Sequence, residues 1–491
     1  MFRYVILFAP FARAQTCPAV SIRSDAAIHE TAPFFGSWNV DSSRDRLFFD
    51  LNFSDPQFVY LATQIGAPGR IRFGGTGNDA LNYALGSAPP CHASSSTYEC
   101  LNQTVWDSLA SLSAASGTPL IFGVNIHPAD SGDSPPKAAW NGTNARAALT
   151  FMKAQGAPLF GLELGNEQNT IMTAVEQAAA FRVLSGVLDD VYGSSSDRPV
   201  LLGPDPHSFK DAGSALPVTV RYISDFVEAA GDILAYATHH EYIEIDYQNV
   251  VDPTFLDLTN TIAQAVVAGV RNVSATVGVV AGEIGPHNGG TYGPGGVVPN
   301  CAGNKVCGRF GSAIWYADSM STKAAAGYAL YCRQDVIGAD YGLINSTSLA
   351  PSADYWLLVL WKRLVGPRVL AVSGLPPKAT TRAYAFCAAP SATSTATLVL
   401  INLADASACV GLPAGFAQPG APLTQYSLTP GAGGVTSADT LLNGVPLVVG
   451  ADGQLPALAG KTVAQAGGVT LPPLSVTLLT VPLAGGVAAC S

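Results

Sequence analysis

The chain has 491 residues, of which 48% are hydrophobic and only 12% charged, and its formal net charge at pH 7 is −10. This composition is typical of a folded, loop-rich globular protein and excludes an intrinsically disordered chain. Because the chain is acidic and has no run of Lys or Arg, we expect no nucleic-acid partner.

The first residues, MFRYVILFAPFARAQTC, contain a short apolar segment followed by Ala12-Arg13-Ala14, the small-residue pattern of a signal-peptide cleavage site. We therefore predict a signal peptide over residues 1–14 and a secreted, extracellular protein, with the vacuole or lysosome as alternative destinations. No later apolar run is long enough to span a bilayer without interruption, so no integral membrane span is expected. Five glycosylation triplets are consistent with this route, at Asn52, Asn102, Asn141, Asn272 and Asn345.

Nine cysteines in a secreted chain predict disulfides and at least one thiol left over. Cys91 with Cys100, and Cys301 with Cys307, are close enough in sequence to close local loops. None of the spacings is that of a zinc site, so we expect no metal ion and no cofactor.

Eight short apolar runs alternate with segments of helical periodicity. The runs cover residues 33–40, 70–75, 119–125, 159–166, 199–205, 233–240, 277–283 and 327–334. Continuous apolar strands that alternate with helices indicate a parallel sheet covered by helices. Eight such units favour a closed (β/α)₈ TIM barrel over an open sheet, and we place this barrel at residues 33–365.

After about residue 365 the segments become short and β-rich, and Gly, Pro and Asp turns separate them. TATLVLINLA (395–404) and VTLLTVPLA (476–484) are examples. This pattern predicts a C-terminal all-β domain, a β-sandwich, over residues 366–491. We expect the N-terminal segment, residues 15–32, to add an edge strand to it. The predicted fold class is therefore α/β, a TIM barrel with a β-sandwich domain.

Polar residues at the ends of the predicted barrel strands are the candidates for a site, because TIM-barrel active sites lie at those ends. Two carboxylates stand out, Glu167 after the fourth run and Glu283 after the seventh, 116 residues apart. Two facing carboxylates suit glycoside hydrolysis, in which one protonates the leaving oxygen and the other attacks the anomeric carbon. Either Glu alone is equally compatible with a strand-end carboxylate that caps a helix or pairs with a cation.

GLELGNEQN (161–169) resembles the acid/base motif of glycoside hydrolase family 79, the heparanase and β-glucuronidase family, and VVAGEIG (279–285) resembles its nucleophile strand. The resemblance continues through RFGGTGND (72–79), HHEY (239–242) and YCRQDVIGADYGLIN (331–345), and the last of these is closer to the plant-type heparanase-like branch. It reaches Cys490, for which it implies Cys387 as the partner.

The resemblance implies a retaining, exo-acting β-glucuronidase in which Glu167 is the proton donor and Glu283 the nucleophile. The two carboxyl groups should then lie about 5–5.5 Å apart. The residues implied to line the sugar subsite or to support Glu283 are Asn166, which would meet the sugar 2-OH, with Asp41, Asn125, His239 and Tyr242. Arg333 is expected to buttress a catalytic carboxylate, and Asp205 to be structural.

The resemblance also implies how a uronate carboxylate is held. Backbone N–H groups of Gly289 and Gly290, together with Tyr341 and with Gln334 nearby, would bind it. Glycine lets the backbone approach an anion closely, so this recognition requires no salt bridge.

The expected partner is a glucuronic-acid-containing glycan of the cell wall or extracellular space, or a small glucuronide, bound by a monomeric protein. The loops that would flank the cleft offer only Lys137 and Lys210 as cations, so cleavage of the sulfated chains of animal heparanase is not expected. Two alternatives stay open: a retaining barrel glycosidase that acts on a neutral sugar, and a non-catalytic glycan-binding protein on the same barrel.

Overall fold

A computed structural model describes most of the chain. The described residues are 17–43, 48, 51–86, 100–126, 140–207, 209, 211, 213–287, 291–293, 296–298, 306, 308–389, 392–465, 468–485 and 488–490. Outside these ranges lie the predicted signal peptide (1–14), Gly289 and Gly290, Cys91, Cys301 and Cys307, and Lys137 and Lys210.

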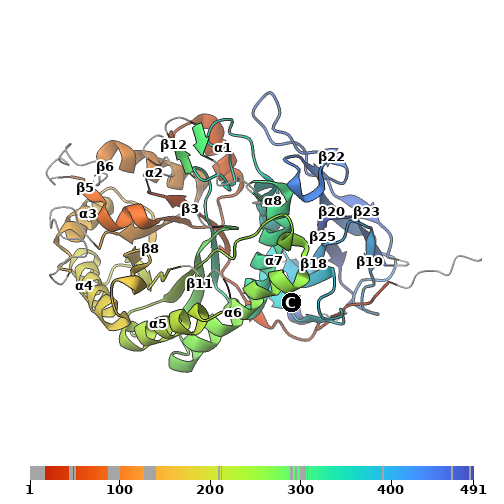
Figure 1. Ribbon diagram of the computed structural model, residues 1–491, viewed down its shortest axis with the longest axis horizontal. Helices are drawn as coiled ribbons and strands as arrows, with labels where there is room; N and C mark the ends of the chain where they lie inside the picture. Colours follow the sequence, from red (N-terminus) through yellow and green to blue (C-terminus); the bar gives the residue numbers. More distant parts are fainter. Residues whose placement is uncertain are drawn as a thin grey trace, which may run out of the picture.

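Eight parallel strands close into a barrel and follow one another around the ring in chain order (Figure 1). They are β3 (Gly36–Asp41), β4 (Ile71–Gly74), β7 (Leu120–Val124), β8 (Leu159–Leu164), β9 (Val200–Gly203), β10 (Tyr236–Glu241), β11 (Gly278–Ile284) and β14 (Leu330–Arg333). Each of the eight apolar runs contains one of these strands or most of it. The predicted TIM barrel is therefore confirmed.

Eight helices cover the outside of the barrel, one after each strand. They are α1 (Pro56–Gln64), α2 (Gln103–Ser116), α3 (Thr143–Ala154), α4 (Ala174–Tyr192), α5 (Ala215–Ala230), α6 (Pro253–Val273), α7 (Phe310–Ala326) and α8 (Ala353–Leu364). Local signals begin several of them: Asp55 accepts hydrogen bonds from two backbone N–H groups of α1, and Thr173 forms a capping box with Glu176 at α4.

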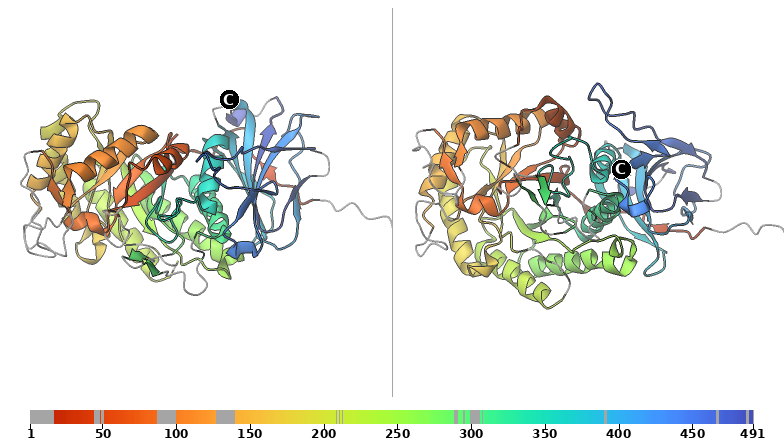
Figure 2. Two further views of the ribbon diagram at one scale, coloured as in Figure 1. Left: turned by 90° about the horizontal axis from the view of Figure 1, so that it is seen from above. Right: turned by 45° about the horizontal axis from the view of Figure 1, so that its top comes forward.

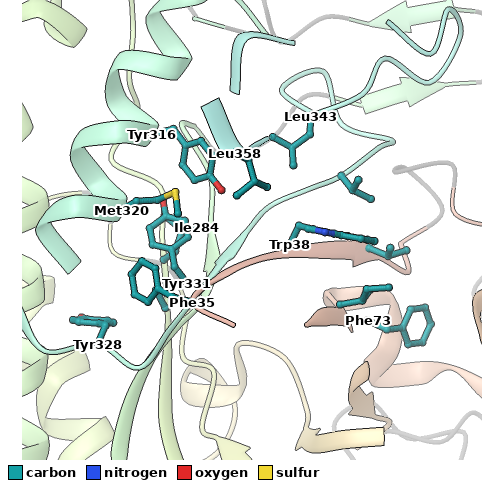
Figure 3. Packing of buried hydrophobic residues seen from close by; sticks show 14 of the residues in the cluster. Phe35, Trp38, Phe73, Ile284, Tyr316, Met320, Tyr328, Tyr331, Leu343 and Leu358 are labelled. Carbon is teal, nitrogen blue, oxygen red and sulfur yellow. The ribbon is translucent and has the colours of Figure 1, made fainter. Parts of the chain in front are cut away.

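Helices α7 and α8 lie between the barrel and the C-terminal β-sheet, as both views of Figure 2 show. For this reason α7 is buried over almost its whole length, and not on one stripe only. Figure 3 shows Tyr316 and Met320 of α7 and Leu358 of α8 packed towards Phe35 and Tyr331 of the barrel. The rings of Tyr316 and Tyr331 lie 5.7 Å apart.

The C-terminal part is built on a nine-stranded sheet in the order β2-β15-β17-β18-β25-β20-β21-β22, with β23 also paired to β20. Its strands are β2 (His29–Glu30), β15 (Val365–Leu370), β17 (Thr381–Ala388), β18 (Ala392–Asn402), β20 (Leu423–Pro430), β21 (Thr440–Leu442), β22 (Val445–Pro446), β23 (Lys461–Val463) and β25 (Ser475–Pro482). Two-stranded sheets pair β1 (Ser21–Ile22) with β16 (Val372–Ser373) and β19 (Ala408–Val410) with β24 (Val469–Leu471). Two more lie on the barrel side: β5 (Asn82–Ala84) with β6 (Cys100–Asn102), and β12 (Thr291–Gly293) with β13 (Gly296–Val298).

Strand β18 shows why this sheet needs a layer on each face. Its residues alternate, so Val399 and Ile401 join the core shared with the barrel helices, whereas Leu398 and Leu400 join a second core. That second core also contains side chains of β1, β19 and β24. The predicted sandwich is thus one large sheet covered on its outer face by two short ones.

The N-terminal segment supplies β1 and β2, which pair with β16 and β15. Two disulfides join distant parts of the chain: Cys387 to Cys490, which confirms the pair implied by the family resemblance, and Cys17 to Cys409, which was not predicted. Cys100 is also disulfide-bonded, and Cys332 is a buried free thiol. These bonds are typical of proteins from oxidising compartments.

Among the helices of the described residues, none is both long and apolar enough to cross a membrane.

Candidate active site

The interior of the barrel changes from apolar to charged towards the carboxyl ends of the strands. Ile121, Leu202, Val280, Leu330 and Cys332 form the apolar layer. Charged and polar side chains lie closer to the strand ends, among them Arg72 on β4 and Glu163 on β8. Since these side chains are almost completely buried, their charges must be balanced within the barrel.

Arg72 is the centre of this network. Its Nε donates to Glu163 Oε2 at 2.7 Å, and its Nη1 donates to Glu283 Oε2 at 2.7 Å. Its Nη2 lies 3.3 Å from Asn166 Oδ1 and 3.4 Å from Asp205 Oδ2. The guanidinium therefore connects four strands of the barrel, and its planar set of donors suits this better than a lysine would.

Glu283 ends β11 and is buried, with 6% of its surface exposed. Arg72 holds its Oε2, and Tyr242 donates its hydroxyl to Oε1 at 2.6 Å. Burial by itself would raise the pKa of Glu283, but His240, Arg72 and the Tyr242 hydrogen bond together bring that pKa below its ordinary value. The carboxylate is thus kept ionised, which is the state that a nucleophile requires.

His240 on β10 lies between the carboxylates. Its Nδ1 is 3.0 Å from Glu167 Oε1 and 3.9 Å from Glu283 Oε1, and its Nε2 is 3.3 Å from Asp205 Oδ1. Burial opposes a charged imidazole, but Glu283, Asp205 and Glu167 outweigh it and raise the pKa of His240 to about 10. At neutral pH the ring is therefore a cation that donates to Glu167.

The loop after β8 presents Glu167 to the mouth of the barrel. Gly165 has φ 76°, where a Cβ would meet Gln168 at 2.8 Å, and Glu167 itself is left-handed at φ 55°. Asp79 fixes this turn, because its two oxygens accept from the backbone of Asn166 at 2.7 Å and from the amide of Gln168 at 2.9 Å. The Glu167 side chain is 23% exposed and that of Glu283 8%, so Glu167 is the more open to solvent.

One carboxylate oxygen of Glu167, one of Glu283 and one ring nitrogen of His240 lie within 4.8 Å of one another. This separation fits the short spacing of retaining glycosidases, about 5–5.5 Å between carboxyl groups, and is too short for the water of an inverting enzyme. Three such groups can also form a metal site, but both oxygens of Glu283 already accept hydrogen bonds, from Arg72 and Tyr242.

The predicted sugar-subsite residues differ in their surroundings. Asp41 and Gln334 lie at the ends of the neighbouring strands β3 and β14, and Gln334 Nε2 donates to Asp41 Oδ2 at 2.7 Å. Gly75 passes close to this pair, since a Cβ there would lie 2.4 Å from Asp41 Oδ1. Asn125 is fully buried and its amide donates to Leu81 O at 2.6 Å, so its contact with sugar stays a prediction.

Tyr341 lies beside Tyr242 and His287, with ring centroids at 6.5 Å and 5.0 Å. Tyr341 therefore lies next to the ring of Tyr242, whose hydroxyl donates to Glu283. Gly289 and Gly290, the backbone groups implied to bind a uronate, lie outside the described residues.

The structure places His240, rather than the predicted His239, beside the two carboxylates. His239 Nε2 is 2.9 Å from the Tyr328 hydroxyl, and burial lowers the pKa of His239 to about 3. The alternation of side chains along a strand could have distinguished the two histidines. If Tyr242 faces Glu283, then His240, two residues earlier, faces the same side and His239 faces the opposite side. The register shift between His239 and His240 in the pairing with β11 accompanies this arrangement.

Four other charged residues have positions that the sequence interpretation did not give them. Arg72 and Glu163 were not selected, and Asp205, expected to be structural, contacts both Arg72 and His240. Arg333 does not buttress a catalytic carboxylate: it forms a buried ion pair with Asp354 of α8. An Arg on one apolar strand and a Glu on another predict a buried pair inside a barrel, because an isolated buried charge is too costly.

Comparison with known proteins agrees with this geometry. Residues 37–321 match the N-terminal domain of glycosyl hydrolase family 79. Heparanase-like protein 3 of Arabidopsis thaliana is 27% identical over 463 residues, covering 84% of this chain and 81% of that protein. Baicalin-beta-D-glucuronidase of Scutellaria baicalensis is 23% identical over 427 residues, covering 80% and 76%. The GH51 arabinofuranosidase of Xanthomonas axonopodis pv. citri shares the fold, with a TM-score of 0.65, 14% identity, and 95% and 100% coverage.

Proposed function

The chain belongs to glycosyl hydrolase family 79, on the plant heparanase-like branch, and we propose that it is an exo-acting β-glucuronidase with Glu283 as nucleophile and Glu167 as acid/base. As a member of this family it is a glycoside hydrolase of the retaining type. The observation that carries the proposal is the pair of carboxylates within 4.8 Å at the barrel mouth, one buried and held ionised, the other open to solvent.

In the first half-reaction, a Glu283 carboxylate oxygen attacks the anomeric carbon and the bond to the leaving oxygen breaks. Glu167 transfers its proton to that oxygen, so that the aglycone leaves as an alcohol. Arg72 and Tyr242 orient the Glu283 carboxylate through its two oxygens. The product of this step is a covalent glycosyl-enzyme ester.

In the second half-reaction, Glu167 takes a proton from water, which attacks the anomeric carbon and releases Glu283. Before it takes this proton, Glu167 is a carboxylate. The imidazolium of His240, 3.0 Å away, stabilises it by a charge-assisted hydrogen bond. The same contact keeps the Glu167 side chain in a single orientation towards the glycosidic oxygen.

The substrate that we propose is a terminal β-linked glucuronic acid, either on a cell-wall or extracellular glycan or on a small glucuronide. A plant relative named for cleaving the glucuronide baicalin supports this class. We assign the uronate carboxylate to Gly289, Gly290 and Tyr341, with Gln334 beside Asp41 at the neighbouring strand ends. Asn166 would bind the sugar 2-OH. Heparanase-like relatives and the disulfides favour an extracellular or lysosomal-type location, and we propose secretion of a monomer.

A panel of 4-nitrophenyl glycosides tests this proposal. We expect the β-glucuronide to be hydrolysed with a kcat/KM at least about 100-fold above those of the β-glucoside and β-xyloside, because the latter lack the carboxylate to which we assign a hydrogen-bonded site. Proton NMR of the fresh reaction should show the β-anomer of glucuronic acid first. A preference for a neutral sugar would overturn the uronate assignment, and glucuronide binding without turnover would indicate a glycan-binding protein.

The two neighbouring histidines provide a matched pair of variants. His240→Asn is expected to lower kcat for the β-glucuronide by about 10- to 100-fold, since it removes the cation between Glu167 and Glu283. His239→Asn loses contacts with the Tyr328 hydroxyl and the His240 carbonyl, away from the two carboxylates, and should reduce stability more than kcat. Steady-state kinetics with denaturation midpoints of both variants would decide this, and a greater loss of kcat in His239→Asn would contradict the assignment.

A further inference from the structure

Two carboxyl groups beneath the catalytic pair share one arginine. Glu163 and Asp205 are 2% and 1% exposed, and Arg72 contacts both, at 2.7 Å from Glu163 Oε2 and 3.4 Å from Asp205 Oδ2. Their remaining oxygens, Glu163 Oε1 and Asp205 Oδ1, are buried and receive no hydrogen bond from an N–H group or hydroxyl of the described chain. Asp205 Oδ1 has only the ion-pair contact with His240 Nε2 at 3.3 Å.

Counting only the fully buried groups of this cluster, without the partly exposed Glu167 that also contacts His240, leaves one negative charge too many. Arg72 and His240 are the cations, whereas Glu163, Asp205 and Glu283 are three buried carboxyl groups. An unbalanced buried charge is strongly destabilising. A proton on one carboxyl group balances the cluster, and its O–H supplies a donor for the oxygen that lacks one.

The surroundings indicate which group carries this proton. Asp205 has two cations beside it, and Glu283 has Arg72, His240 and the Tyr242 hydroxyl. Within the described part of the chain, the one cation that contacts Glu163 is Arg72. Two further carboxyl groups near this end of the barrel have other hydrogen-bond partners: Asp79 accepts from Asn166 and Gln168, and Glu167 contacts His240.

We propose that Glu163 is a neutral carboxylic acid, that its Oε1–H donates to Asp205 Oδ1, and that it positions Arg72 against Glu283. The shifts in pKa have the matching directions. Burial, then the charge and hydrogen bond of Asp205, raise the pKa of Glu163 well above its ordinary value in spite of Arg72. Burial also acts on Asp205, but Arg72 and His240 outweigh it and lower that pKa.

The consequence concerns the proposed nucleophile, so this inference rests on the proposed role of Glu283. An ionised Glu163 would compete with Glu283 for the charge of Arg72. A neutral acid still accepts the Nε hydrogen bond and fixes the guanidinium, and it leaves the positive charge to Glu283. Glu163 is a positioning residue in this arrangement, since it does not reach the substrate.

Three variants test the proposal. Glu163→Leu removes the acceptor for Arg72 Nε, and kcat for the β-glucuronide should fall about 100-fold. Glu163→Gln should restore kcat to within about tenfold of the wild type, because a neutral amide accepts from Arg72 and donates to Asp205. Asp205→Asn has the same size but removes a required charge, and it should resemble Glu163→Leu. If Glu163→Gln is as inactive as Asp205→Asn, Glu163 is ionised and the proposal fails.

A spectroscopic measurement separates this proposal from the proposed function. The infrared difference spectrum of wild type minus Glu163→Gln at pH 7 should contain the carbonyl stretching band of a protonated carboxylic acid that shifts in D₂O. The difference is needed because burial raises the pKa of Asp79 as well. Absence of this band would overturn the proposal even if the enzyme is active, and its presence would support it even if no glucuronide is cleaved. Should Glu163→Gln not fold, ¹³C labelling of the Glu carboxyl groups in the wild type gives the same reading.

Discussion

Glu283→Gln is expected to lower kcat/KM for an aryl β-glucuronide by about 10⁴- to 10⁶-fold, which is the scale of losing a covalent nucleophile. The amide cannot attack the anomeric carbon. The loss should fall on kcat, because Gln keeps the size of the side chain and can still accept from Arg72 or Tyr242. Stopped assays with concentrated variant measure the residual rate.

The matched control is Glu228→Gln on the exposed surface of α5, which should keep full activity. A 2-fluoro glucuronide with a good leaving group should label the wild type once, and peptide mass spectrometry should find the label on Glu283. Undiminished turnover in Glu283→Gln, or a label on another residue, would refute the assignment of the nucleophile.

The environment of Glu283 also predicts a pH effect. Its folded-state pKa is lowered, so its ion pairs contribute stability above the pKa of the unfolded state, and this contribution is lost as the pH falls through the folded value. The pKa of His240 is raised to about 10, so its stability contribution depends on pH in the opposite direction. This contribution is complete below the pKa of histidine in the unfolded state and is lost as the pH rises through about 10. Both contributions are complete together only between the unfolded-state pKa values of Glu and His, roughly 4.3 and 6.5, so these two groups stabilise the protein most at mildly acidic pH.

Much of the fold could be predicted because barrel strands buried on both sides carry a strong apolar signal. Glu167 and Glu283 could be found because a carboxylate at the end of such a strand is conspicuous. Long-range pairing had no comparable signal: the disulfide between Cys17 and Cys409 joins residues 392 apart, and many pairings of nine cysteines were possible.

The charged network beneath the two carboxylates was not predicted from the sequence, for a different reason. Arg72 stands first in RFGGTGND, a segment used only for the family resemblance, and its role depends on four strands meeting in three dimensions. His239 was preferred to His240 because two adjacent residues fit a motif equally well, and only the face of the strand separates them. Residue type and position along a strand thus indicate that a site exists, whereas its electrostatics depend on contacts between strands.

Glu167→Ala should show a loss of activity that depends on the leaving group. An alkyl β-glucuronide needs a proton on its departing oxygen, so its kcat/KM should fall by about 10²- to 10⁴-fold. A 2,4-dinitrophenyl β-glucuronide leaves without a proton, so its first half-reaction should be nearly normal and the covalent intermediate should accumulate. The burst of dinitrophenolate, measured before steady state, reports this directly.

Azide provides the decisive control for this second prediction. With the Glu167 side chain removed, a small anion can enter the space beside His240 and attack the intermediate without a general base. Azide should therefore accelerate the variant and yield β-glucuronyl azide, but it should not accelerate the wild type. Equal losses on both substrates, without azide rescue, would show that Glu167 supports the structure of the site and does not transfer the proton.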